Sequence, residues 1–139
     1  MEDATTTSFP ESSVRGISLQ CAFEMFAGDD DTNLLKELAR ILKVGGKAII
    51  VPLYMNTHYC AYATPEFFNS GKAVPLAKEY VCFEWKGIPS ARFYDVDALI
   101  KRVLNPIEKL GMSYKLLALK NKVELGRNIY CHFILEITK

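Results

Sequence analysis

The residues best suited to chemistry gather in the middle of the chain, between residues 55 and 94. This segment contains one histidine, His58, and a concentration of aromatic side chains: Tyr59, Tyr62, Phe67, Phe68, Tyr80, Phe83 and Trp85. An imidazole titrates near neutral pH, so His58 is a candidate catalytic general base, with a surface loop histidine as the alternative. The aromatic side chains could form a lid over a substrate, or they could pack a long loop onto the core.

Other reactive groups are sparse. Four cysteines lie far apart and form no C-x-x-C pair: Cys21, Cys60, Cys82 and Cys131. This spacing predicts reduced, mostly buried thiols and no zinc or other metal site. Ser12 and Ser13 lack the glycine context of a nucleophile elbow, which disfavours a hydrolase.

The composition is that of a globular domain and excludes some classes of partner. Of 139 residues, 50% are apolar, and 17 basic residues face 16 acidic ones for a net charge of +1. This balance disfavours nucleic-acid binding, which needs a basic excess or stripe. The longest apolar run, residues 48–55, is far shorter than the about 20 residues of a spanning helix. We expect one domain over residues 1–139, no membrane segment and, since residues 1–5 do not resemble a signal peptide, a cytoplasmic location.

The first half of the chain predicts a strand, a helix and a second strand. Residues 14–20 favour a short strand, and the acidic run 29–31 favours the start of a helix whose apolar stripe covers residues 33–43. Gly45 and Gly46 are expected to end this helix. The apolar run 47–54 predicts a strand buried on both faces, which leaves the sheet at Pro52.

The second half predicts a long insert followed by a helix and two strands. Within the insert, residues 55–94, we expect a short helix near 65–70 and a strand around 79–85. Asp95 is a candidate N-cap for a helix that ends at Gly111 and is kinked by Pro106 near Arg102. Its expected buried stripe is Val96, Leu99, Val103, Ile107 and Leu110. Residues 112–119 and 129–137 favour an antiparallel pair of strands.

One string of residues is specific enough to suggest a family. Residues 35–47 read Leu-Lys-Glu-Leu-Ala-Arg-Ile-Leu-Lys-Val-Gly-Gly-Lys, after Asp3-Ala4, Phe9-Pro10 and a strand-and-turn segment at 17–24. This arrangement resembles the class I S-adenosylmethionine-dependent methyltransferases, of the type 11 kind, and Arg92-Phe93-Tyr94 resembles the family more loosely. The chain departs from the family pattern at three positions: Arg15, Met25 and Val44.

The resemblance implies an α/β fold with a partial Rossmann-like sheet. It covers the family's fourth to seventh strands, with the last strand antiparallel, and thus the C-terminal half only. None of the chain's glycines forms G-x-G between a strand and a helix, which is the family's cofactor-binding turn. The resemblance therefore implies that residues 14–20 form an exposed sheet edge, which predicts a homodimer or a partner chain that covers it.

The resemblance also implies a set of site residues. Asp3 and Ala4 would contact the adenine of S-adenosylmethionine, with a frayed terminus as the alternative. Gln20 and Cys21 would also line the cofactor site. The substrate pocket would be built from a further set: Glu24, Tyr54, Tyr59, Tyr62 and Trp85. For Glu24, a solvent-facing turn carboxylate is the alternative.

Two functions follow from these observations. The first is methyl transfer from S-adenosylmethionine to a small-molecule acceptor, an in-line displacement for which the protein mainly aligns the reactants. The second is a non-catalytic binding or assembly module that keeps the half-fold and dimerises through its exposed edge. Another nucleotide-binding α/β protein is disfavoured, because the sequence has no P-loop or dinucleotide-binding motif.

Overall fold

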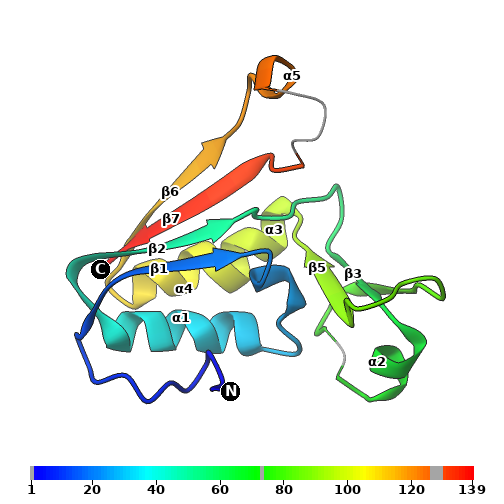
Figure 1. Ribbon diagram of the computed structural model, residues 1–139, viewed down its shortest axis with the longest axis horizontal. Coiled ribbons are helices and arrows are strands. Elements are labelled where there is room, and N and C mark those ends of the chain that lie inside the picture. Colours follow the sequence, from blue (N-terminus) through cyan, green and yellow to red (C-terminus); the bar gives the residue numbers. More distant parts are fainter. Residues whose placement is uncertain (1, 73, 126–129) are drawn as a thin grey trace.

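A four-stranded sheet forms the centre of the molecule in a computed structural model that describes residues 2–72, 74–125 and 130–139. The strand order is β1 (Val14–Gln20), β2 (Leu42–Val51), β7 (Phe133–Thr138) and β6 (Ser113–Ala118) (Figure 1). β1 and β2 are parallel, whereas β7 is antiparallel to both β2 and β6. The predicted α/β order and the closing antiparallel pair are confirmed, although β7 begins at Phe133 and residue 129 lies outside the described residues.

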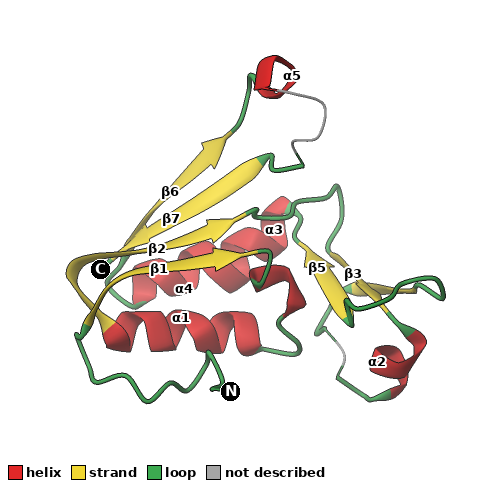
Figure 2. Ribbon diagram, viewed as in Figure 1, coloured by secondary structure: helices red, strands yellow, loops and turns green. Residues whose placement is uncertain are grey.

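Helix α1 (Asp30–Ile41) joins the two parallel strands and covers one face of the sheet (Figure 2). Its predicted apolar stripe is buried against Leu19, Ile50 and Leu135 of the sheet. The expected glycine C-cap is wrong, because the helix ends at Ile41 and Leu42 is already extended. The glycines instead lie in a bulge of β2, where a Cβ on Gly46 would come within 2.8 Å of the Lys43 carbonyl oxygen.

Only one face of β2 is buried, contrary to the prediction of burial on both faces. Ala48 and Ile50 are fully buried beneath the helices, while Ile49 between them is 36% exposed. The apolar run at 47–51 had suggested helices on both sides, but the helices of the described residues pack on one side of this sheet. As predicted, Pro52 stands where the strand ends, after Val51.

The second long helix is continuous but changes its winding. It begins as α3 (Val96–Leu99), passes through a π-helical segment, η2 (Ile100–Leu104), and ends as α4 (Asn105–Lys109). Asp95 caps it as predicted, since its carboxylate accepts a hydrogen bond from the Ala98 N–H at 2.8 Å. The disturbance expected from Pro106 takes the form of this π turn, which accommodates a ring that would clash with the Arg102 carbonyl. Within the predicted stripe, Val96 and Leu110 are exposed.

The insert folds into a small sheet of its own. Its strands lie in the order β4 (Lys78–Val81), β3 (Cys60–Ala63) and β5 (Ser90–Phe93), with α2 (Pro65–Asn69) beside them (Figure 1). The predicted helix at 65–70 and a strand starting near 79 are confirmed, but β3 and β5 were not expected. Two short elements complete the fold: η1 (Phe23–Met25) and α5 (Lys122–Leu125). Among the described residues, no helix has the length and apolar character needed to cross a membrane.

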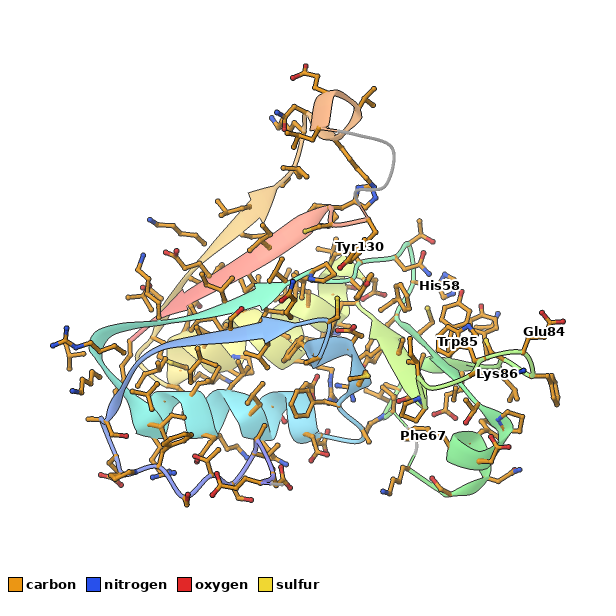
Figure 3. All side chains as sticks on the ribbon, in the orientation of Figure 1. His58, Phe67, Glu84, Trp85, Lys86 and Tyr130 are labelled. Carbon is orange, nitrogen blue, oxygen red and sulfur yellow. The ribbon has the colours of Figure 1, made fainter. Side chains whose placement is uncertain are left out.

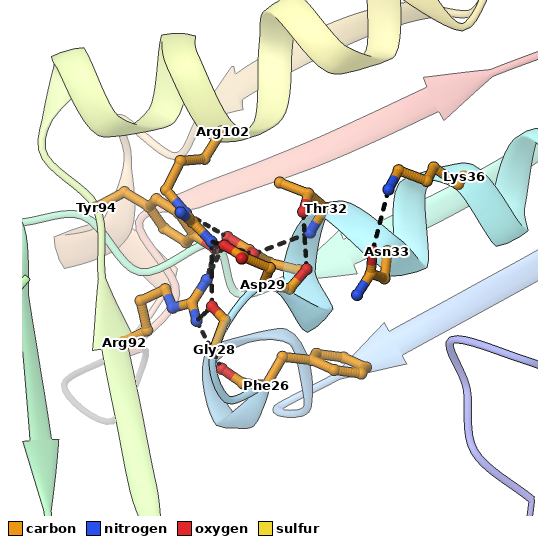
Figure 4. A network of polar contacts seen from close by, with 10 residues as sticks. Phe26, Gly28, Asp29, Thr32, Asn33, Lys36, Arg92, Tyr94 and Arg102 are labelled. Atoms are coloured by element: carbon orange, nitrogen blue, oxygen red, sulfur yellow. Dashed lines mark hydrogen bonds and ion pairs between the residues drawn. The ribbon is translucent and has the colours of Figure 1, made fainter. Parts of the chain in front are cut away.

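A buried ion network joins the insert to α1 and η2 (Figure 4). Asp31, in the first turn of α1, is fully buried and pairs with Arg92 of β5 and with Arg102 of η2. The Arg102 guanidinium donates a hydrogen bond to the Asp31 carboxylate at 2.7 Å, and the Tyr94 hydroxyl donates another to the same carboxylate at 2.8 Å. Burial alone raises the pKa of Asp31, but hydrogen bonds from Arg102 and the charge of Arg92 outweigh burial and hold it below its ordinary value.

We expect Asp31→Asn to lower the free energy of unfolding by about 3–5 kcal/mol, because it leaves the fully buried Arg92 without its counter-charge and removes one of the two carboxylates paired with Arg102. Asp30→Asn is the matched control, since Asp30 lies in the same first turn and makes no ion pair among the described residues. Urea unfolding at pH 7 measures both variants. Equal losses for the two variants would contradict a structural role for the network.

The same carboxylate predicts a pH dependence. Its lowered pKa contributes stability that is present above the ordinary value of 3.8 and is lost as the pH falls through the lowered value. The stability gap between the wild type and Asp31→Asn should therefore narrow only below about pH 3.8. Unfolding curves at pH 7, 4 and 3 test this, and a gap that closes between pH 7 and 5 would count against it.

Candidate functional site

The carboxyl ends of the two parallel strands meet at a turn that begins with Cys21. The Cys21 N–H donates to the Val51 carbonyl at 3.0 Å, which fixes the end of β1 against the end of β2. Cys21 has a left-handed φ of 49°, so the chain turns sharply away from the strand into η1. Its Sγ lies 3.3 Å from the hydroxyl of Tyr130, which precedes β7. Three segments distant in sequence therefore converge at this end of the sheet.

A cavity of about 260 Å³ opens at this convergence. Its walls come from the chain after β2 and the chain before β7: Pro52, Leu53, Tyr54, Met55, Tyr130, His132 and Phe133. Figure 3 labels Tyr130 beside the start of β7. Ligands of open α/β sheets bind outside the carboxyl ends of the strands, and this cavity occupies that position.

Glu24, in η1, is a buried acidic residue whose charge acts on Tyr54 and Tyr130, two tyrosines that line this cavity. It is only 9% exposed, and its Oε2 has no hydrogen-bond partner among the described residues. Burial raises the pKa of Glu24 above its ordinary value. Burial also raises the pKa of Tyr54, and the neighbouring charge of Glu24 raises it further. The alternative of a solvent-facing turn carboxylate is therefore wrong.

A second, more open hollow of about 460 Å³ lies in the insert. Its lining is uncharged: Met55, Asn56, Tyr62, Cys82, Trp85 and Phe93. The Tyr62 ring is central, with its centroid 5.2 Å from that of Tyr80, 5.4 Å from that of Phe93 and 6.0 Å from that of Trp85. Phe93 also lies 5.2 Å from Tyr54, so aromatic rings connect this hollow to the first cavity.

The structure thus brings together most of the predicted substrate-pocket residues. Tyr54 lines the first cavity, and Tyr62 and Trp85 line the second hollow. Glu24 does not line either one, but its charge acts on Tyr54. Tyr59 lines neither of these two cavities. Its ring stacks on the Tyr94 ring, with 5.8 Å between the two centroids. Its hydroxyl is buried without a partner among the described residues.

His58 is exposed and belongs to the outer surface of the insert (Figure 3). Its Nε2 lies 3.0 Å from the Tyr80 hydroxyl, and its ring packs edge-on against the Tyr80 ring. To accept a proton from a methyl acceptor, His58 would have to break its contact with Tyr80 and turn toward that acceptor.

The predicted cofactor contacts lie in two separate places. Gln20 is exposed at the end of β1, next to Cys21. Asp3 and Ala4 are exposed in the N-terminal segment, where the Asp3 carboxylate accepts hydrogen bonds from the backbone and hydroxyl of Thr5, both at 2.8 Å. That segment is attached to α1, because Thr7 donates to Glu37 at 2.8 Å. No hydrogen bond between described residues links Asp3 to Gln20 or Cys21.

The described residues fit only one side of a nucleoside cofactor. The ends of β1 and β2 offer a turn, a buried carboxylate and a cavity, but the chain has no glycine-rich turn leading from a strand into a helix. These residues therefore do not complete a donor site by themselves.

Of the cysteines, Cys60 is buried, whereas Cys21, Cys82 and Cys131 are half-buried, which corrects the expectation of mostly buried thiols. All four are free, and His, Cys, Asp and Glu side chains of the described ranges form no cluster that could hold a metal ion.

Comparison with solved structures identifies the fold. An S-adenosylmethionine-dependent methyltransferase of Methanosarcina mazei superposes with a TM-score of 0.58 at 15% identity, over 99% of this chain and 65% of that one. This chain has a class I methyltransferase-like fold. A Thermotoga maritima methyltransferase, described as a possible histamine N-methyltransferase, gives 0.54 at 17% identity, over 99% and 61%. The YcgJ protein of Bacillus subtilis gives 0.50 at 13%, over 99% and 69%.

The similarity is one of fold and does not extend to close sequence relatives. The scan of family models finds no match, and the search of curated proteins finds no significant one. The chain spans less than two thirds of the Methanosarcina and Thermotoga methyltransferases.

Sequence reasoning missed Tyr130 and Phe93 as site residues. Tyr130 reaches Cys21 across 109 positions of sequence, and no local pattern marks such a contact. Phe93 belongs to the Arg92-Phe93-Tyr94 motif, which resembles the methyltransferase family loosely and did not predict a role in the site. The buried arginines Arg92 and Arg102 were missed for a related reason, because a charged residue on a strand or helix normally reads as exposed.

We expect Glu24→Gln to stabilise the protein at neutral pH by roughly 1 kcal/mol, because burial disfavours the ionised carboxylate and its Oε2 has no hydrogen-bond partner among the described residues. The raised pKa means that the folded state holds the proton more tightly than the unfolded state does. The destabilisation therefore appears above the ordinary value of 4.5 and grows until the raised pKa is passed. Thermal melts at pH 4 and pH 8 measure it, and a gain in Tm equal at both pH values would refute the assignment.

Proposed function

We propose that this chain corresponds to the C-terminal portion of an S-adenosylmethionine-dependent methyltransferase that acts on a small-molecule acceptor in the cytoplasm. The observation that carries the proposal is the cavity at the carboxyl ends of the parallel strands, in a fold shared with S-adenosylmethionine-dependent methyltransferases. Both of those proteins are longer than this chain, as the proposal requires.

In this proposal, the residues divide between the donor and the acceptor. Gln20 and Cys21 contact the donor, and Asp3 and Ala4 contact its adenine. Bound S-adenosylmethionine supplies an activated methyl group on a good leaving group. The residues of the predicted substrate pocket form the acceptor side, where they position the nucleophile and exclude water: Glu24, Tyr54, Tyr59, Tyr62 and Trp85. His58 serves as a base only for an acceptor that enters from the insert.

Titration with S-adenosylhomocysteine tests the donor side of the proposal. Because the chain lacks a glycine-rich turn, we expect weak binding with a Kd of about 1 mM, or about −4 kcal/mol. Amide signals of Gln20, Cys21 and Glu24 should shift in ¹H–¹⁵N spectra. ATP is the control ligand and should leave these signals in place. Shifts that ATP reproduces, or no shift with S-adenosylhomocysteine, would contradict donor binding.

A non-catalytic assembly module is the second candidate, and the position of β1 favours it. β1 is an edge strand that pairs with β2 on one side and with no other described strand. Its Arg15, Gly16 and Ser18 are exposed, so their backbone groups are available to another chain. Pairing of β1 with a second copy would produce a homodimer, and this function requires no catalysis.

We expect Ser18→Glu to weaken this dimer about tenfold, which corresponds to about 1.4 kcal/mol. Two copies related by a twofold axis would bring the two new carboxylates close together across the paired edges. Ser113→Glu on β6, the opposite edge of the sheet, is the control and should leave the dimer intact. Analytical ultracentrifugation at tens of micromolar measures both. A wild-type monomer would reject the assembly proposal, and equal effects of both variants would reject β1 as the interface.

A further inference from the structure

The hollow of about 460 Å³ in the insert has an aromatic and uncharged wall. Its volume falls within the range of small-molecule sites, about 300–1,000 Å³. Three of the described residues that line it carry aromatic rings, and none of them carries a charge: Met55, Asn56, Tyr62, Cys82, Trp85 and Phe93. Glu84 and Lys86 flank Trp85 in the sequence, but both are exposed and neither lines the hollow (Figure 3). The wall favours a neutral ligand, because a charged one would lose its hydration without gaining a counter-charge.

The rings of the hollow are held in place by the small sheet. Tyr62 of β3 pairs across the strands with Tyr80 of β4, and their rings stack with 5.2 Å between centroids and 19° between planes. Phe93 of β5 stands nearly perpendicular to Tyr62, at 82° and 5.4 Å, while Trp85 is tilted by 37° at 6.0 Å. Aromatic rings gain from stacked and edge-to-face contacts, and rings fixed in advance lose little freedom on binding. This arrangement favours a flat aromatic ring as the ligand.

The polar groups of the hollow are mainly hydrogen-bond donors. Asn56 accepts the Thr57 N–H with its Oδ1 at 2.8 Å, and its Nδ2 donates to the Cys60 Sγ at 3.3 Å. One N–H of the Asn56 amide is therefore still free to donate, since a primary amide has two. The Tyr62 hydroxyl and the Trp85 indole N–H make no hydrogen bond to another described residue, and an indole N–H can only donate. An oxygen that accepts hydrogen bonds would complement these groups.

The hollow adjoins the cavity at the carboxyl ends of the parallel strands. Met55 lines both of them. The ring centroids of Phe93, which lines the hollow, and Tyr54, which lines the cavity, lie 5.2 Å apart. A ring bound in the hollow would therefore lie beside the cavity on which the proposed function depends.

We propose that this hollow binds a neutral, flat aromatic compound that carries a carbonyl oxygen next to its ring, the class of the aryl ketones. Tyr62, Trp85 and Phe93 pack against the ring, and Asn56 donates a hydrogen bond to the oxygen. The inference rests on the proposed function insofar as a hydroxylated compound of this class is then the methyl acceptor. Binding itself does not require the donor.

The test compares three probes in the wild type at neutral pH. Acetophenone has the proposed features, cyclohexyl methyl ketone keeps the carbonyl on a saturated ring, and benzoate keeps the aromatic ring but carries a charge. We expect acetophenone to bind at least about tenfold more tightly than either of the others, because it alone is both aromatic and neutral. Trp85 is the chain's single tryptophan, so the one indole N–H signal in ¹H–¹⁵N spectra reports on the hollow and gives the Kd.

Variants then locate the site. Tyr62→Leu removes the central ring and should weaken acetophenone binding about tenfold. Asn56→Asp keeps an oxygen for the Thr57 N–H but replaces the free donor with a carboxylate, and it should weaken binding by a similar factor. Phe83→Leu is the matched control, because Phe83 is an aromatic residue of the same insert that is 83% exposed and does not line the hollow. It should leave the Kd unchanged.

The outcomes separate this inference from the proposed function. Equal binding of acetophenone and either of the other probes in the wild type would overturn the ligand class, whatever the variants do to folding. Binding that is unchanged in Tyr62→Leu, or weakened equally in Phe83→Leu, would overturn the hollow as the site. Acetophenone binding without S-adenosylhomocysteine binding would support the site and contradict the methyltransferase function. The reverse result would support a donor site and reject the aryl ketones as the acceptor class.

Discussion

Two guanidinium groups surround one buried carboxylate, and much of the structure depends on this contact. Asp31 lies in the first turn of α1, Arg92 lies on β5 and Arg102 on η2, so three separate elements share one charge. Arg92 also donates to the carbonyls of Phe26 and Gly28, at 2.9 and 2.7 Å (Figure 4). These carbonyls follow η1 directly, and the network therefore also holds the segment that carries Glu24.

The burial of the main sheet is unequal, and this follows from where its helices lie. α1 and the helix from α3 to α4 cover one face, where Ala48 and Ile50 lose all contact with water. On the other face, Ile49 stays partly exposed, and β1 ends the sheet with free backbone groups. A sheet with one open face and an open edge is suited to association. The assembly proposal uses this property.

The candidate site could be predicted in part. Glu24 and Tyr54 were predicted from the resemblance to class I methyltransferases. Both follow apolar strands, and parallel strands bring their carboxyl ends together. Tyr130 could not be predicted, because its contact with Cys21 depends on how β7 inserts between β2 and β6. The insert illustrates the same limit. Its aromatic residues were evident, but the stacking of Tyr62 on Tyr80 requires the pairing of β3 with β4.

The sequence by itself determined the order of the main-sheet strands and their helices, the buried stripe of α1, the strand at residues 14–20 and the cap at Asp95. These features depend on neighbours a few positions away, so periodicity and side-chain type are sufficient to specify them. Only the tertiary structure decided that Asp31 is a buried ion-pair partner instead of a helix-start signal, and that Glu24 lacks a donor. Burial and charge pairing are set by segments far apart in sequence, and their energies exist only once those segments are in contact.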